Sequence, residues 1–285
     1  MDKKICQMVT DRIVAEMEKG IIPWKRPWAG VNDGAISHST GKSYSLLNQI
    51  VLGKPGEYLT YKQCAAEGGH VKAGEHGAPV VFWKQIFVPS KDVKNKDGSP
   101  KMDKIPVLKY FTVFHIDQCE GIKPKYETVP ATHPDPIKEA EDIVEKYESR
   151  EKIKIIRDDL SNKAFYVPSQ DYIQVPNIKQ YTDSAEYYST LFHEMVHSTG
   201  HSVRLNRFTG KAARAAFGSE EYSKEELVAE IGAATLNSHV GIETDACIKN
   251  SAAYVQSWVK VLRNDPTMII SAAGKADKAV EYILN

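Results

Sequence analysis

The stretch at residues 191–201, LFHEMVHSTGH, constrains what this chain can fold into more than any other segment. His193 and His197 are four residues apart, so in a helix both rings project from the same face. Asp183, followed three residues later by an acid, has the pattern of a capping box, and Gly200 is a residue at which helices commonly end. The spacing therefore predicts one helix from Asp183 to Gly200 with two imidazoles on one side.

Two imidazoles in this arrangement can hold a single tetrahedral ion, and Glu194 directly follows the first of them. The set has the HExxH pattern of zinc peptidases, in which the glutamate is the general base toward the attacking water. The alternative is a solvated helix that carries two surface histidines. Four large apolar residues crowd the same turns: Leu191, Phe192, Met195 and Val196. Because such a helix is expected to be buried, and unpartnered buried polar groups are costly, the pattern favours one Zn2+ per chain with Glu194 as the catalytic residue.

A catalytic zinc site needs a third protein ligand and an open position. His201 is the nearest candidate, but it lies four residues past the second histidine and beyond the expected end of the helix. The segment SKEELVAEIGAATL at 223–236 predicts a second helix with Ser223 as its cap, on which Glu226 and Glu230 lie one turn apart. Each acid has an ordinary alternative, because Glu226 also completes a capping box with Ser223, and Glu230 also suits a solvated surface. Because most other residues of this helix are small or apolar, a carboxylate on it is more plausibly functional, and either acid could complete the site.

A proline-rich stretch divides the chain. Residues 122–137, IKPKYETVPATHPDPI, carry four prolines and no strong hydrophobic period, which is typical of a linker. We therefore predict two domains, at 1–125 and 138–285, joined by a linker at 126–137. Both are expected to mix helices and strands, so the predicted fold class is α+β.

Hydrophobic periodicity places the main elements within these domains. The first domain is expected to begin with a helix at 5–19 and to contain two strands, at 79–88 and 107–116, joined by a long mobile loop. After the linker, the pattern predicts a helix at 137–150 and a short hairpin at 163–175. An edge strand of that hairpin could align an extended peptide.

Tryptophans flank two cations in IIPWKRPW at residues 21–28. Aromatic faces beside positive charge suit single-stranded nucleic acid, where bases stack and phosphates need cations. The candidate DNA-binding residues are Trp24, Lys25, Arg26, Trp28, Lys42, Tyr44, Lys62, Trp83 and Lys84. The charge distribution gives weak support to DNA binding by this part of the chain. Residues 1–127 contain 19 basic and 14 acidic residues, although the net charge of the whole chain is zero. The alternative for each single tryptophan is a place in the hydrophobic core.

Composition disfavours a membrane protein and a secreted protein. No apolar run approaches the roughly 18 residues of a membrane-spanning helix. The first twenty residues are amphipathic and contain acids, unlike a secretory signal. Four scattered cysteines, Cys6, Cys64, Cys119 and Cys247, suit a reducing compartment better than a disulfide scaffold. We therefore expect a cytoplasmic protein with no membrane partner.

The segment EELVAEIGA resembles the thermolysin-like arrangement of zincins. In that arrangement a glutamate on a later helix is the third metal ligand, and an acid four residues on orients a ligand histidine. The resemblance implies His193, His197 and Glu226 as the metal ligands and Glu230 as the orienting acid. This chain has Glu where that family has Asp at the second acid, so the two roles could be exchanged, with Glu230 as the alternative ligand.

Ordered motifs along nearly the whole chain resemble ArdC-type antirestriction proteins. They are WKRPW, TGKSYSLLN, YLTYKQCAAEGGHVKAGEHGAPVVFWK and VFHIDQCEG, followed by HEMVHSTGH, RLNR and EELVAEIGAA. The resemblance implies an N-terminal domain that binds single-stranded DNA, a C-terminal zincin-like metallopeptidase domain, and a role on mobile elements, where incoming DNA is protected from host restriction. The expected partners are single-stranded DNA and an unidentified protein substrate. The alternative is a single-stranded-DNA-binding antirestriction protein whose metal domain is structural or proteolytically inactive.

Overall fold

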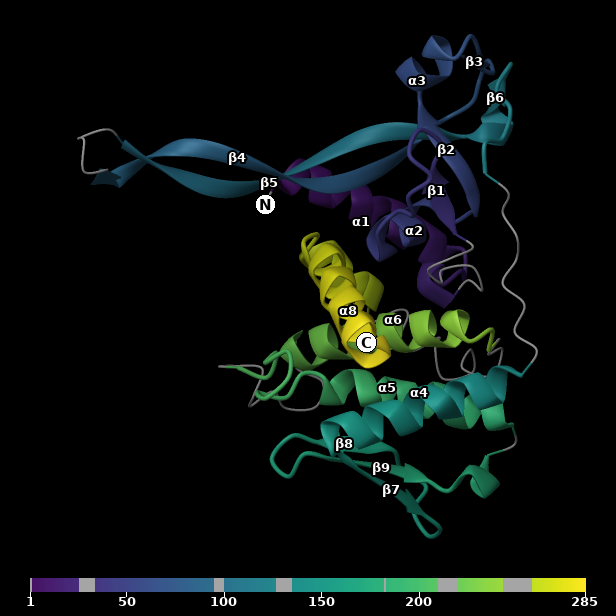
Figure 1. Ribbon diagram of the computed structural model, residues 1–285, viewed down its shortest axis with the longest axis vertical. Coiled ribbons are helices and arrows are strands. Elements are labelled where there is room, and N and C mark those ends of the chain that lie inside the picture. Colours follow the sequence, from purple (N-terminus) through teal and green to yellow (C-terminus); the bar gives the residue numbers. More distant parts are fainter. Residues whose placement is uncertain are drawn as a thin grey trace.

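The computed structural model describes residues 2–25, 34–94, 100–126, 135–181, 183–209, 220–242 and 258–285. Figure 1 shows two lobes stacked along the long axis of the molecule. The front lobe, which ends at Tyr126, contains most of the β-structure and a long two-stranded arm. The rear lobe, which begins at Asp135, is mainly helical and has one small sheet.

A mixed four-stranded sheet forms the centre of the front lobe. Its strands are β1 (Ala35–Ser37), β2 (Gly56–Thr60), β4 (Ala78–Lys94) and β5 (Pro100–His115), in the order β1-β2-β5-β4. β1 and β2 are parallel, and the other two pairs are antiparallel. The smaller elements are α3 (Tyr61–Ala66), β3 (His70–Val71), η2 (Ile116–Gln118) and β6 (Cys119–Glu120). Between the sheet and the rear lobe lie α1 (Lys3–Glu18), η1 (Pro23–Lys25) and α2 (Leu46–Leu52).

The arm consists of the outer parts of β4 and β5, which extend far beyond the rest of the sheet (Figure 1). β5 pairs with β2 only at residues 113–115, so its outer residues pair with β4 alone. The predicted hairpin is confirmed, but the predicted long loop is wrong, because residues 89–94 and 100–104 continue the strands. Their polar, lysine-rich composition suggested a loop. In a two-stranded ribbon with both faces open to solvent, however, polar side chains are compatible with strand pairing.

The rear lobe begins with α4 (Pro136–Glu151), whose cap Asp135 accepts a hydrogen bond from the N–H of Lys138. Its sheet has the order β7-β9-β8, from β7 (Lys154–Asp158), β8 (Phe165–Val167) and β9 (Tyr172–Pro176). β8 and β9 form the predicted hairpin, whereas β7, parallel to β9, was not predicted. The remaining elements are η3 (Ile178–Gln180), α5 (Ser184–Ser198), α6 (Glu220–His239), a helical segment at 258–264 and α8 (Met268–Leu284).

α5 is the helix predicted from Asp183 onward, and it lies at the centre of the rear lobe. Asp183 caps it by accepting a hydrogen bond from the N–H of Ala185. Leu191 and its apolar neighbours on the same turns are completely buried, which decides against the solvated-helix alternative. α6 packs closely on α5, because a Cβ atom at Gly232 would lie only 2.8 Å from a γ-carbon of Val196. This close approach brings the acids of α6 within reach of the histidines of α5.

One hydrophobic core runs through both lobes. At their junction the Trp24 ring packs edge-to-face on the Trp258 ring, with centroids 5.8 Å apart. The Thr10 hydroxyl donates to the carbonyl of Pro266 over 2.8 Å, and Arg263 forms an ion pair with Glu18. The lobes are therefore packed against each other rather than tethered only by the connecting chain.

Replacing Trp24 with alanine is expected to lower the free energy of unfolding by about 3 kcal/mol, because a large, completely buried ring is lost from the core between the lobes. Urea unfolding followed by circular dichroism would measure the change. Trp83 is the matched control, since its side chain is 48% exposed and its replacement is expected to change stability by less than about 0.5 kcal/mol. Equal effects of the two substitutions would contradict the different burial of the two rings.

The predicted linker lies mostly outside the described residues, and the predicted domain boundaries stay predictions. α4 begins at Pro136, so the last two residues of the predicted linker are helical, as a proline in the first turn of a helix allows. Over the ranges that the structure describes, no helix combines the length and the apolar character needed to cross a bilayer.

Candidate metal centre

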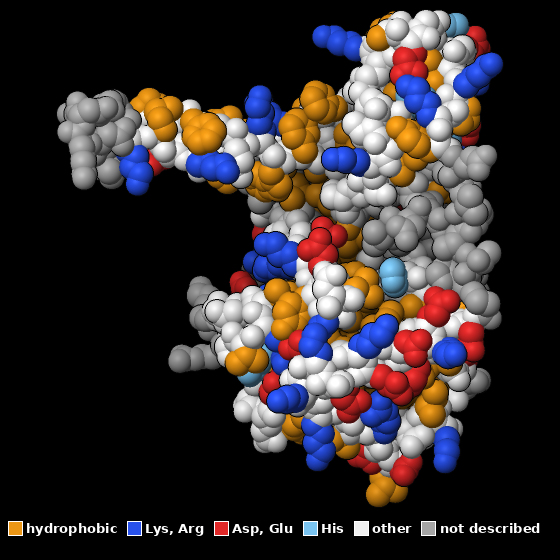
Figure 2. Space-filling model, in the orientation of Figure 1, with side chains coloured by type: hydrophobic (Ala, Val, Ile, Leu, Met, Phe, Trp, Pro, Cys, Tyr) orange, Lys and Arg blue, Asp and Glu red, His pale blue; other side chains and the backbone are white. Residues whose placement is uncertain are grey.

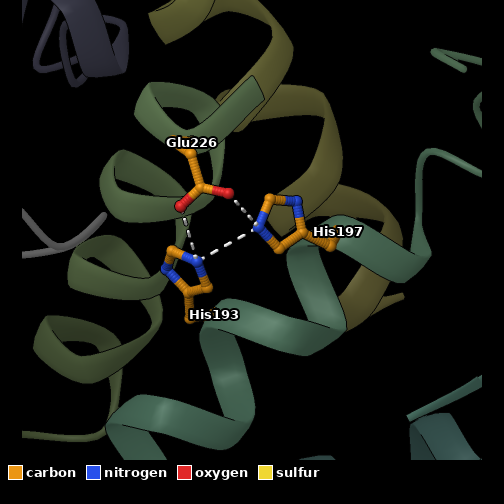
Figure 3. A group of neighbouring side chains, drawn as sticks. All are labelled: His193, His197 and Glu226. Atoms are coloured by element: carbon orange, nitrogen blue, oxygen red, sulfur yellow. Dashed lines mark hydrogen bonds and ion pairs between the residues drawn. The ribbon is translucent and has the colours of Figure 1, made fainter. Parts of the chain in front are cut away.

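α5 and α6 bring two imidazoles and one carboxylate together (Figure 3). The Nε2 atoms of His193 and His197 are 3.1 Å apart. Glu226 faces both of them, with Oε2 3.5 Å from Nε2 of His193 and Oε1 3.3 Å from Nε2 of His197. These are the predicted ligand residues, contributed by two helices that are separate in sequence.

The spacing of these atoms fits one face of a tetrahedral coordination shell. With metal–ligand bonds of about 2.1 Å, neighbouring ligand atoms in a tetrahedron lie about 3.4 Å apart. The three separations here, 3.1, 3.3 and 3.5 Å, bracket that value. Two imidazoles and one carboxylate are also a donor set of catalytic zinc sites, which keep a fourth position open. The residues present therefore fit a small divalent cation.

The start of α6 removes one ordinary explanation for Glu226. The helix begins at Glu220 rather than at the predicted Ser223, so Ser223 lies inside the helix and does not cap it. Glu226 then lies well inside the helix, where it cannot be part of a capping box at the N-terminus. Its side chain is only 17% exposed and points to the two histidines, as Figure 3 shows.

Each imidazole has a further carboxylate near its other ring nitrogen. Oε1 of Glu230 is 3.8 Å from Nδ1 of His193, and Oε1 of Glu225 is 3.5 Å from Nδ1 of His197. Glu230 thus lies on the side of His193 where an orienting acid is expected, whereas Glu226 lies on the ligand side. Glu225 was not predicted, although its place beside Glu226 in the EE pair was a signal that could have been used.

His201 lies outside this group of ligand atoms. It follows the end of α5, and its Nδ1 accepts a hydrogen bond from the N–H of Val203 over 3.4 Å. Within the described ranges the group contains only the two histidines of α5 and Glu226. Glu194, the predicted general base, follows His193 on α5 and is 7% exposed.

The carboxylates around the site favour protonated histidines. Burial, the largest single influence, lowers the pKa of both imidazoles, but at His193 the hydrogen bond with Glu226 and the negative charges of Glu194 and Glu230 together raise the pKa above its ordinary value. At His197 burial again acts downward, and Glu225 and Glu226 together raise the pKa to about 10. Burial acts upward on the pKa of Glu226, but the two histidines hold that pKa well below its usual range. A cation that enters the site must therefore displace protons from the histidines.

Those predicted DNA-binding side chains that the structure describes do not form one surface. Trp24 is a correction, because its ring is completely buried against Trp258 and cannot stack on a base in this conformation. Tyr44 is partly buried, with its ring edge-to-face on Tyr58. Arg26 and Trp28 lie outside the described residues, as does the side chain of Lys25.

The remaining candidates are exposed at two places. Lys42 lies after the turn that follows β1, and Lys62 lies in the first turn of α3. Trp83 and Lys84 lie on the arm, but successive residues of a strand point to opposite faces, so they cannot belong to the same platform.

Each part of the chain resembles a known family. Residues 3–114 match the N-terminal domain of anti-restriction factor ArdC, and residues 139–275 match the zincin-like metallopeptidase family. The chain is 34% identical to a DNA primase TraC of Escherichia coli, in an alignment of 304 positions that covers 99% of this chain but only 27% of that protein. A protein of Sinorhizobium fredii, uncharacterized protein y4eC, is 28% identical over 98% of this chain and 91% of its own length.

Two solved structures of the antirestriction ArdC protein from plasmid R388 are similar over both lobes. The Mn(II)-bound structure has a TM-score of 0.73 and 33% identity, covering 98% of this chain and 96% of that one. The metal-free structure has a TM-score of 0.72 and 33% identity, covering 99% and 97%. The predicted architecture of an N-terminal domain of this type followed by a zincin-like domain, with mixed helices and strands, is confirmed.

Proposed function

Because this chain belongs to the ArdC family of antirestriction proteins, we propose that it binds single-stranded DNA with its front lobe and hydrolyses a protein substrate at a zinc centre in its rear lobe. In this proposal the protein acts on a mobile element and protects incoming DNA from restriction. The observation that carries the enzymatic part is the meeting of two imidazoles and one carboxylate at tetrahedral spacing. The front-lobe part rests on the family and on the exposed aromatic and basic residues of the arm.

His193, His197 and Glu226 would hold the ion. Their two nitrogens and one oxygen suit Zn2+, and imidazole with carboxylate also accepts Mn2+, the ion named for the R388 relative. We propose zinc because three protein ligands of this kind, with one open position, are typical of catalytic zinc sites. A cation held here would supply a Lewis acid beside the scissile carbonyl group.

Glu194 would move the proton that hydrolysis requires. Its carboxylate accepts a proton from the attacking water, and then returns that proton to the amine that leaves as the peptide bond breaks. The residue is buried next to His193 on α5, which keeps its carboxylate close to the ligand cluster. Glu230 and Glu225 would orient the two histidines through their Nδ1 atoms.

The small sheet of the rear lobe offers a place for an extended substrate. β8 is an edge strand in the order β7-β9-β8, and α5 packs against both β8 and β9. A peptide that adds to this edge would run beside the helix that carries the histidines. With only three residues in β8, side-chain contacts would have to supply most of the specificity.

A second candidate function is single-stranded DNA binding with a metal domain that is structural or proteolytically inactive. One observation favours it: Glu226 forms ion pairs with both His193 and His197, so these three side chains satisfy one another without any reaction on a substrate. The buried Glu194 favours the enzyme, since a structural site needs no general base.

The arm is the part of the front lobe that best suits single-stranded DNA. Cross-strand pairing places Trp83 and Phe87 of β4 on the same face as Tyr110 and Met102 of β5. This Trp83 face also carries Lys104, directly opposite Phe87. All four apolar side chains are at least 47% exposed, and Figure 2 shows apolar and basic side chains alternating along the arm. Exposed rings beside cations are what base stacking and phosphate contact require.

Charge along the arm complements a nucleic acid. Residues 78–115 contain seven lysines against three aspartates. The opposite face carries Lys84 and Lys109, with the rings of Phe82 and Phe111 stacked 4.9 Å apart. Those two rings already stack on each other. On the Trp83 face Val81 and Leu108 are buried in the core, so the part of this face from Trp83 outward is the surface open to bases. We therefore place the bases on the Trp83 face.

Replacing Trp83 with alanine is expected to weaken binding of an oligo(dT) strand at least about fivefold, because one stacking surface is lost. Lys84→Ala, on the opposite face, is expected to change affinity much less if the strand follows the Trp83 face. Fluorescence anisotropy with the full-length protein at two salt concentrations would measure both. Leu160→Ala, which removes a 96% exposed side chain of the rear lobe, is the control. Unchanged affinity of Trp83→Ala, or equal affinity of the wild type for duplex DNA, would contradict stacking on the arm.

The enzymatic part of the proposal is tested first by metal content. Full-length protein that has been stripped with a chelator and returned to Zn2+ should contain about one ion per chain, measured by mass spectrometry of the metal. A chain that binds no zinc after this treatment, and no manganese when Mn2+ is supplied instead, would refute the proposed centre.

A further inference from the structure

Arg207 lies between the C-terminal end of α5 and the first turns of α6. Its side chain is 6% exposed. One terminal nitrogen, Nη2, donates to Oε1 of Glu225 over 2.6 Å and to the carbonyl of Val196 over 2.7 Å. The other, Nη1, donates to the hydroxyl of Thr199 over 2.6 Å, and Nε faces both oxygens of Glu225 at 3.3 Å. The guanidinium group therefore contacts both helices that build the metal centre.

These contacts determine where the carboxylate of Glu225 can lie. Three nitrogens of the guanidinium form a rigid planar fork, and two of them contact Glu225. The same carboxylate is 3.5 Å from Nδ1 of His197. A carboxylate at that position accepts the Nδ1 proton and leaves the Nε2 lone pair of His197 directed at the proposed ion.

We infer that Arg207 is a positioning residue of the metal centre, which acts through Glu225 on the orientation and tautomer of His197. The inference rests on the proposed function, because it assumes that His197 is a metal ligand. Arg207 is not one of the three residues that would hold the ion. Its effect is to hold one ligand histidine with its metal-binding nitrogen facing Nε2 of His193 and the carboxylate of Glu226.

A purely structural role is the competing explanation, because Arg207 also satisfies a carbonyl near the end of α5. Arg204 makes it possible to separate the two roles. Its side chain is 1% exposed, its Nε donates to the carbonyl of Ser198 over 2.8 Å, and it is paired with Asp171. Both arginines therefore bind the end of α5 and at least one carboxylate. The carboxylates paired with Arg204 belong to Asp171 in the β8–β9 turn and Glu151 at the end of α4, and neither is a partner of a ligand histidine.

The experiment compares Arg207→Gln with Arg204→Gln in the full-length protein. Zn2+ affinity is measured by competition with a chromophoric chelator, at a temperature where circular dichroism shows each metal-free variant to be folded. Both substitutions are expected to lower the thermal unfolding midpoint. Only Arg207→Gln is expected to weaken zinc binding, by about tenfold to a hundredfold, whereas Arg204→Gln should stay within about threefold of the wild type.

Two further variants keep the test decisive if Arg207→Gln does not fold. Arg207→Lys retains the charge but loses the fork, so an intermediate loss of affinity is expected. Glu225→Gln should weaken zinc binding as much as Arg207→Gln, and the double substitution should be no worse than either single one, because both act through the same contact.

The possible failures are distinguishable. A wild type that binds no zinc would refute the proposed function and leave the role of Arg207 without a basis. A wild type that binds zinc, together with Arg207 and Glu225 variants that bind within about threefold of it, would overturn the positioning role alone. Equal losses in the Arg207 and Arg204 variants would assign both residues to stability.

Discussion

His193→Ala is expected to lower the affinity for Zn2+ by about a thousandfold or more. Structural zinc sites bind with roughly 10–16 kcal/mol through four ligands, so the loss of one ligand corresponds to about 4 kcal/mol. Two protein ligands, His197 and Glu226, would remain, and they leave the ion largely open to water. Chelator competition with the full-length protein would measure the loss, and Glu226→Ala should show a loss of similar size.

His201→Ala is the control for this prediction, because His201 lies only four residues beyond His197 but outside the cluster. Its zinc affinity should match that of the wild type. If His193→Ala still bound a full equivalent of zinc with unchanged affinity, the zinc site would have to lie elsewhere in the protein. A loss with His201→Ala as large as with His193→Ala would give His201 the ligand role that we propose for Glu226.

Glu194→Gln is expected to keep zinc binding close to that of the wild type and to slow proteolysis by about a thousandfold. The amide has nearly the shape of the carboxylate but cannot accept the proton of the attacking water. Because the substrate is not known, the reaction would be followed in host-cell lysate with added single-stranded DNA and zinc. New protein N-termini would be mapped by mass spectrometry for wild type and variant.

The outcome also separates the two candidate functions. Cleavage products that appear with the wild type and vanish with Glu194→Gln would support the peptidase. Equal cleavage by both proteins would remove Glu194 as the general base. No cleavage by a zinc-loaded wild type, together with unimpaired DNA binding, would favour the alternative in which the metal domain is structural or inactive.

Local patterns were enough to predict the helices that carry the centre. The spacing of His193 and His197 places both rings on one helix face whatever the rest of the chain does, and the structure has that helix. Glu226 and Glu230 are likewise one turn apart on α6. The predicted cap at Ser223 was wrong, because residues 220–223 are already helical and helix ends depend on contacts beyond the local sequence.

Contacts between distant segments account for what local patterns did not predict. Trp24 lies next to two basic residues in sequence and resembled a stacking platform, but it packs on Trp258, more than two hundred residues away. Glu225 was not singled out from the sequence, and only the fold places it between Arg207 and His197. The lysine-rich stretch at 89–104 was predicted to be a loop, but its two ends pair with each other as strands, for example Pro89 with Met102.

The sequence by itself therefore determined that both imidazoles share one helix face, with Glu194 directly after the first of them. Only the tertiary structure decided that Glu226 rather than Glu230 faces both Nε2 atoms, and that the two lobes share a core. The physical reason is that helical and strand periods define directions within one element. Distances between elements depend on how closely they pack, as at Gly232 against Val196.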